Sequence, residues 1–207
     1  MSHGRAEDLL FNKADTYSVF EGQKRAMAKA VEELPAKRVL DDADQALAGE
    51  LAKKFTIDVP QLREDGITVS PPREVDVDVS RDFRRAVYGH GPHHVKGISV
   101  TFSVPFIGDQ EMFFVRPNSF DTAPPRGQVG QTFLEVTYSG VDLNAEDLKR
   151  QFADFLASTK KYLGWHSESV TPFNNSLHRL AADYLAARKA RLSHSEQLVG
   201  SLGYEVK

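Results

Sequence analysis

The sequence contains no cysteine, which excludes disulfide bridges, thiolate metal sites and cysteine nucleophiles together. It has no apolar run near the roughly 18 residues that a membrane-spanning helix needs. Residues 1–10 lack the basic and apolar regions of a signal peptide. These absences predict a cytoplasmic protein that does not enter a membrane.

The chain also lacks low-complexity tracts and a strong net charge. Its 207 residues are 41% hydrophobic and 27% charged, with a net charge of −3, which is the composition of an ordinary globular protein. The negative charge argues against wholesale electrostatic binding to nucleic acid. Acidic residues exceed basic ones in 1–80, and basic residues slightly exceed acidic ones afterwards. The C-terminal part is therefore the expected anion-facing side.

The common catalytic and cofactor-binding motifs are missing as well. The sequence has no P-loop, no G-x-G-x-x-G after a strand, no G-x-S-x-G elbow and no H-E-x-x-H pair. We therefore expect no cofactor. The absence of a complete catalytic constellation favours a protein that is not an enzyme.

The N-terminal part has a helical period. Apolar residues recur at three- and four-residue steps through 5–34 and again through 41–55, which is typical of amphipathic helices. We expect an interruption near Gly22 and a stop at Pro35. The pattern predicts an N-terminal helical hairpin, or arm, over residues 1–60.

After residue 60 the period of the apolar residues changes to two, which is typical of strands. The alternation is clearest at 74–80 and 95–106, and it recurs at 111–116 and 131–138. Glycine, aspartate and proline in the connections favour turns between neighbouring strands. The sequence therefore predicts an antiparallel sheet of four to five strands.

Two further helices are expected at the C-terminal end, one over 144–163 and one that begins at Thr171 and Pro172. Each has an apolar stripe that can cover one face of a sheet. Runs of strands followed by runs of helices belong to the α+β class. We predict an α+β domain over 61–207, with its sheet covered by the C-terminal helices.

Three histidines lie within five residues, at His90, His93 and His94. Imidazole is the commonest transition-metal ligand, so this cluster is a candidate metal site. A zinc site would need a fourth ligand, and adjacent histidines on an extended chain point apart. Glycine and proline in the same segment are typical of a turn between strands, so we prefer the turn to the metal site.

A second polar cluster consists of Asp109 and Glu111, with Arg116 near them in the sequence. Paired carboxylates can act as general acid and base or hold a divalent cation. Gly-Asp between two strands is equally a hairpin signal, and no His, Ser or Lys accompanies the pair at a recognisable spacing. We prefer a turn of possible function, and an enzyme with an unrecognised carboxylate and histidine site remains an alternative.

The two C-terminal helices carry eight basic residues that could meet a phosphate backbone or an acidic protein surface. Basic residues in the last turn of a helix also complement its dipole, so a solvated helical face explains them too. The candidates for nucleic-acid or partner binding are Lys149, Arg150, Lys160, Lys161, Arg179, Arg188, Lys189 and Arg191.

Several segments carry a resemblance to a known group of proteins. These segments are 104–120, 124–127, 169–174, 187–192 and 202–204. Over about residues 98–204 the chain resembles the N-terminal region of uncharacterised bacterial proteins in which a linker and a C-terminal effector follow, often a restriction-endonuclease-like domain. The resemblance implies a role in defence against phage or foreign DNA, and it carries over no catalytic residue.

The sequence thus predicts a non-catalytic sensing, assembly or regulatory module of a bacterial nuclease-type defence protein. We expect it to bind a protein partner or a second copy of itself. The alternatives are a DNA-binding module that uses the basic C-terminal helices, and an enzyme. An enzyme should gather its polar groups in one pocket, whereas a binding module should present an apolar or basic patch.

Overall fold

A computed structural model describes residues 8–42, 44–80 and 93–201. These residues form two compact units, and each is described by itself. The first unit combines the residues up to Lys13 with Val59–Trp165. The second combines Ala14–Asp58 with the chain from His166 onward. The predicted boundary at residue 60 lies close to the division at Val59. The structure also places the residues up to Lys13 with the sheet, and the chain from His166 onward with the N-terminal helices.

An antiparallel sheet forms most of the first unit. Its longest strand is β6 (His94–Ile107), where the alternation of 95–106 predicts a strand. One side of β6 pairs with β9 (Phe133–Gly140). The other side pairs in turn with β3 (Gln61–Leu62), β4 (Thr68–Val69) and β5 (Arg73–Asp78). The predicted antiparallel arrangement is therefore confirmed.

Two more strands extend the sheet beyond β9. Strand β8 (Arg126–Val129) pairs with β9, and β1 (Asp8–Leu9) pairs with β8. Among the described residues the sheet has seven strands, more than the predicted four to five. Three of them, β1, β3 and β4, contain two residues each, which is too short to give a periodic pattern in the sequence.

The strand predicted over 111–116 is wrong. A 3₁₀ helix, η2 (Gln110–Phe114), occupies most of it, and only β7 (Val115–Arg116) is extended. Both Met112 and Phe113 are buried, so the apolar residues here point inward from a helical turn and not from a strand. Short apolar runs do not distinguish these two conformations. A second 3₁₀ turn, η1 (Glu64–Gly66), lies between β3 and β4.

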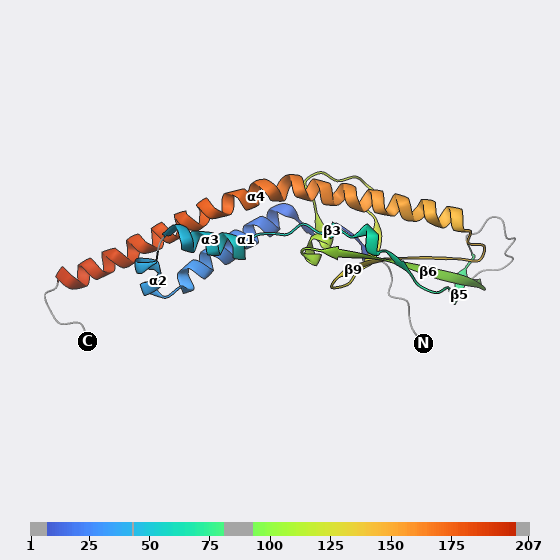
Figure 1. Cartoon of the computed structure of the whole chain (residues 1–207), viewed down its shortest axis with the longest axis horizontal. Coiled ribbons are helices and arrows are strands. Elements are labelled where there is room, and N and C mark those ends of the chain that lie inside the picture. Colours follow the sequence, from blue (N-terminus) through green and yellow to red (C-terminus); the bar gives the residue numbers. More distant parts are fainter. Residues whose placement is uncertain (1–7, 43, 81–92, 202–207) are drawn as a thin grey trace. The chain divides into compact units, whose positions relative to one another are not determined.

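Helix α4 (Ala145–Ser201) covers one face of the sheet with its residues up to Trp165 (Figure 1). The core between them is mainly aromatic, and the Phe102 ring stacks on that of Phe152 with centroids 4.1 Å apart. Leu134 and Val104, which face each other on β9 and β6, are fully buried in the same core. Burial of such side chains stabilises the unit by about 1.5–3 kcal/mol each.

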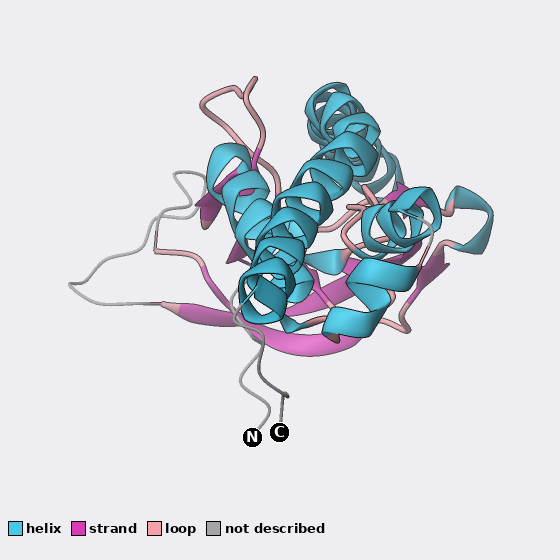
Figure 2. Cartoon of the chain, turned by 90° about the vertical axis from the view of Figure 1, so that its left-hand side faces the viewer, coloured by secondary structure: helices cyan, strands magenta, loops and turns pink. Residues whose placement is uncertain are grey.

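The opposite face of the sheet carries small hydroxyl side chains. Thr101 and Thr137 form a hydrogen bond of 2.8 Å across β6 and β9, and Ser103 donates to Glu135 at 2.7 Å. Figure 2 shows the curved sheet with its strands in magenta. Within the described part of this unit α4 is the only α-helix, and it lies on the opposite face from these hydroxyl groups.

The predicted helical hairpin lies in the second unit. Strand β2 (Ala14–Asp15) leads into α1 (Thr16–Glu33), which is followed by α2 (Ala36–Asp41) and α3 (Asp44–Lys54). Helices α1 and α3 run in opposite directions (Figure 1). The Asp15 carboxylate caps α1 by accepting the Ser18 N–H at 2.8 Å.

Two details of the N-terminal prediction are wrong. Helix α1 continues through Gly22 without interruption, because the loss of roughly 1 kcal/mol for one glycine is smaller than the gain from burying Met27 and Val31 on the same helix. The helix begins at Thr16, and the short strands β1 and β2 precede it. The predicted stop at Pro35 is confirmed.

Two separate C-terminal helices were predicted, but α4 is one helix with Pro172 inside it. An internal proline removes one backbone hydrogen bond and destabilises a helix by about 3 kcal/mol. The buried residues Val170, Phe173 and Leu177 continue the apolar stripe past the proline. Their burial outweighs this loss, so Thr171 and Pro172 do not begin a new helix. None of the described helices is apolar enough over a sufficient length to span a membrane.

Candidate functional site

The histidine cluster is only partly within the described residues. His93 and His94 are exposed, and the His93 backbone N–H donates to the Ser80 hydroxyl at 2.9 Å. His94 pairs with Asp78 at the end of β5 and β6. His90 lies outside the described residues. Across 8–42, 44–80 and 93–201, no three His, Cys, Asp or Glu side chains are close enough to hold a metal ion.

The structure places the second predicted cluster around η2 and at β7. Asp109 and Glu111 are exposed where the chain turns from Gly108, at a φ of 108°, into η2. Arg116 is exposed in β7, and its guanidinium carbon lies 5.0 Å from the ring centroid of Phe120. Arg116 lines a pocket, whereas the two carboxylates are not among the residues described around it.

The basic candidates on α4 are mostly engaged by acidic neighbours. In the first unit the ion pairs are Lys149–Glu146, Arg150–Asp147, Lys160–Glu64 and Lys161–Asp121. In the second unit they are Lys189–Asp44 and Arg191–Glu32. Arg179 is exposed and has no ion pair with any residue that the structure describes. The acidic partners reduce the positive potential that a phosphate backbone would meet.

Arg188 has a structural role in the second unit. Its side chain is buried, and its guanidinium donates to the backbone carbonyls of Val31 and Leu34 at the C-terminal end of α1. The Val31 carbonyl also accepts the Leu34 backbone N–H at 3.3 Å, so Arg188 adds a second donor there. A cation at this position also complements the negative end of the helix dipole. The contact spans more than 150 residues of sequence, so no local pattern predicts it.

The candidate site that the sequence did not indicate is a pocket of about 250 Å³ in the first unit. Residues of β1, the segment after β1, β7, the connection after β7, and α4 line it, and we call it the aromatic pocket. Its lining includes Leu9, Phe11, Arg116, Phe120, Asp121 and Tyr162. Phe120 is 56% exposed, so part of its ring is open to a ligand.

Phe11 forms the inner wall of the aromatic pocket in a strained conformation. Its φ is 54°, the left-handed region, which is disfavoured by about 1–2 kcal/mol for a residue with a side chain. Its ring is buried and stacks on Tyr162 with centroids 4.8 Å apart. Its N–H donates to the Phe113 carbonyl at 2.6 Å. Such strain persists where packing holds the residue, and it is concentrated at binding sites.

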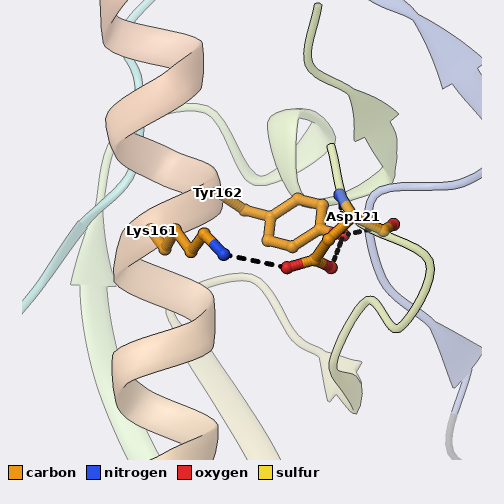
Figure 3. Close-up of polar contacts among 3 residues, drawn as sticks. All are labelled: Asp121, Lys161 and Tyr162. Carbon is orange, nitrogen blue, oxygen red and sulfur yellow. Dashed lines mark hydrogen bonds and ion pairs between the residues drawn. The ribbon is translucent and has the colours of Figure 1, made fainter. Parts of the chain in front are cut away.

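Figure 3 shows how α4 holds Asp121 at the edge of this pocket. The Tyr162 hydroxyl donates to one carboxylate oxygen at 2.7 Å, and the Lys161 ammonium donates to the other at 3.0 Å. The Asp121 backbone N–H also donates to the Tyr162 oxygen at 3.3 Å. Both carboxylate oxygens are therefore bonded, and the position of the Asp121 connection is set by two consecutive residues of α4.

The ionisable groups of the pocket have fixed protonation states near neutral pH. Burial, and then the hydrogen bond with Asp121, raises the pKa of the Tyr162 hydroxyl to about 12. Hydrogen bonds from Tyr162 and then from Lys161 lower the pKa of the Asp121 carboxyl below its ordinary value. A general acid or base works best with a pKa near the working pH, so this pair is suited to binding and not to proton transfer.

The raised pKa of Tyr162 predicts a loss of stability in alkali. An unfolded tyrosine ionises near pH 10, whereas the folded hydroxyl keeps its proton to about pH 12. The contribution of Tyr162 to the free energy of unfolding is thus complete below pH 10. It is lost, by about 2–3 kcal/mol, as the pH rises toward 12. Urea unfolding measured at pH 9 and pH 12 should show this fall. The free energy of unfolding of Tyr162→Phe should fall less over the same pH range. An equal fall in both proteins would show that Tyr162 is not the group responsible.

Trp165 provides a probe of this region. It is the one tryptophan of the chain, and its ring meets that of Tyr162 edge-on with centroids 5.0 Å apart. The Lys161 ammonium lies 4.8 Å from the Trp165 ring centroid. Its fluorescence should therefore report both the unfolding of the first unit and changes around Tyr162.

Comparisons of the chain with protein-family models, with curated proteins and with solved structures found no match. The functional argument therefore depends on the pocket itself.

Proposed function

We propose that the chain is a non-catalytic sensing, assembly or regulatory module that binds a segment of a protein partner, or of a second copy of itself, in the aromatic pocket. The main support for this proposal is the Phe120 ring, which is exposed and lies beside the Arg116 guanidinium at the mouth of a pocket. Aromatic residues and arginine are the types that contribute most to protein interfaces.

The chemistry of the site supports binding over catalysis. Tyr162 stays protonated across the neutral range, because burial and then the hydrogen bond with Asp121 raise its pKa to about 12. Asp121 stays ionised, because hydrogen bonds from Tyr162 and then from Lys161 lower its pKa. Neither group is poised to exchange a proton with a substrate near pH 7, so the enzyme alternative has no support from this pair.

The DNA-binding alternative has weaker support than partner binding. Arg188 is buried, and six of the other basic candidates form ion pairs with acidic side chains. Arg179 is exposed and could contact a phosphate, but one cation contributes little to a salt-dependent interaction with DNA. The wider context, a bacterial nuclease-type defence protein, enters the proposal from the sequence resemblance alone.

Site-specific photo-crosslinking tests the proposal. A benzophenone amino acid is placed at Phe120 in the full chain, and at Phe133 as the control, because Phe133 is a similarly exposed phenylalanine of the same unit outside the pocket. We expect a discrete adduct in cell extract, or a crosslinked dimer of the purified chain, from position 120 only. The adduct should be lost in Arg116→Glu. Equal labelling from both positions, or labelling unaffected by Arg116→Glu, would contradict the proposal.

A further inference from the structure

The size and charge of the aromatic pocket define the class of segment that it can take, if it is the binding site proposed above. We infer that the pocket binds an apolar or aromatic side chain that has a carboxylate next to it. Either the C-terminal carboxylate of the bound chain or a neighbouring acidic side chain can supply this group, since the recognising residues are the same.

The volume of the pocket limits its ligand to a single side chain. At about 250 Å³ it is smaller than the roughly 300–1,000 Å³ of most small-molecule and cofactor sites. Leu9, Phe11 and Tyr162 give it an apolar interior. Because the rings of Phe11 and Tyr162 already stack on each other, an entering side chain meets a preformed surface and loses little energy to rearrangement.

The mouth of the pocket supplies an aromatic face. Phe120 is about half exposed, and Arg116 lies over its ring, which holds both side chains at the opening. An entering aromatic or aliphatic group can cover the rest of the Phe120 ring. Aromatic pairs add favourable energy beyond the apolar area that they bury.

The charges at the mouth select an anion. Arg116 lines the pocket and brings a positive charge. The negative charge of Asp121, also in the lining, is already bonded by Lys161 and Tyr162. A carboxylate of the ligand can therefore approach a guanidinium, whereas an ammonium group would meet a carboxylate that is already engaged. A guanidinium has a planar set of donors that matches the two oxygens of a carboxylate, which makes Arg116 the group that would contact it.

Three probes test the inference on the full chain: N-acetyl-phenylalanine, its neutral amide, and acetyl-Asp-Phe-amide. Binding is followed by ¹H–¹⁵N NMR shifts of the pocket residues and by Trp165 fluorescence. We expect both carboxylate probes to bind about fivefold to tenfold more tightly than the neutral amide, as for a partly exposed charged pair. Higher salt should reduce this preference.

Matched variants assign the preference to individual residues. Arg116→Gln should bring the affinities for acid and amide close together, whereas Phe120→Ala should weaken both about equally. Phe133→Ala should change neither. A neutral amide that binds as well as the acid, or an acid preference that survives Arg116→Gln, would overturn the carboxylate inference while leaving the pocket as a binding site. If no probe binds, the inference is wrong, and the photo-crosslinking at Phe120 decides separately whether the proposed function holds.

Discussion

Replacing Phe11 by alanine should destabilise the first unit by about 3–5 kcal/mol, the usual loss for a buried phenylalanine. The ring is 1% exposed and contacts both Tyr162 and Phe113, so its removal leaves a cavity at the inner wall of the aromatic pocket. Urea unfolding followed by Trp165 fluorescence measures this loss, because Trp165 packs against Tyr162.

Two further variants separate the effect of the ring from the effect of the backbone. Phe120→Ala removes a phenylalanine from the same pocket, but its ring is exposed, so the loss should stay below about 1 kcal/mol. Phe11→Gly should be more stable than Phe11→Ala by about 1 kcal/mol, because glycine adopts a φ of 54° without strain. Equal losses for Phe11→Ala and Phe120→Ala would contradict the burial of Phe11.

Replacing Arg188 by alanine should destabilise the second unit by about 2–4 kcal/mol. The change removes two charge-assisted hydrogen bonds from a buried side chain to the carbonyls of Val31 and Leu34. Thermal unfolding followed by helical circular dichroism measures the loss. Hydrogen exchange of the last turn of α1 should also accelerate.

Arg179→Ala is the matched control for Arg188. It is the same substitution on the same helix, but Arg179 is exposed. The free energy of unfolding should therefore change by no more than about 0.5 kcal/mol. A nucleic-acid role for Arg188 predicts a different result, namely normal stability and weaker binding to DNA. Similar stability of the two variants would show that Arg188 does not cap α1.

The periodicity of the sequence predicted the elements that are long and amphipathic. Strand β6 and the strands β5 and β9 on either side of it were found because one face of each strand is more buried than the other. The short strands β1, β3 and β4 pair through the backbone and have no period. The error at Pro172 arose because the local preference against proline in a helix was outweighed by the apolar stripe that continues past it.

The aromatic pocket could not be predicted in the same way. Its residues come from three segments, near Phe11, near Phe120 and at Tyr162, and none of these segments has a motif that indicates the others. Of the lining residues, Arg116 was predicted to be of possible function, and Lys161, which bonds to Asp121, was a basic candidate in a separate cluster. The fold pairs Lys161 with Asp121 and places Arg116 beside Phe120, which no spacing in the sequence indicates.

The central claim is that this pocket binds and does not catalyse, and NMR titration of the Asp121 carboxyl and the Tyr162 ring tests it most directly. We expect Asp121 to remain ionised down to a pH below the ordinary aspartate value of about 3.9. The Tyr162 hydroxyl should keep its proton until about pH 12. A titration of either group near pH 7 would contradict the claim, because the pocket would then hold an acid or base poised for proton transfer.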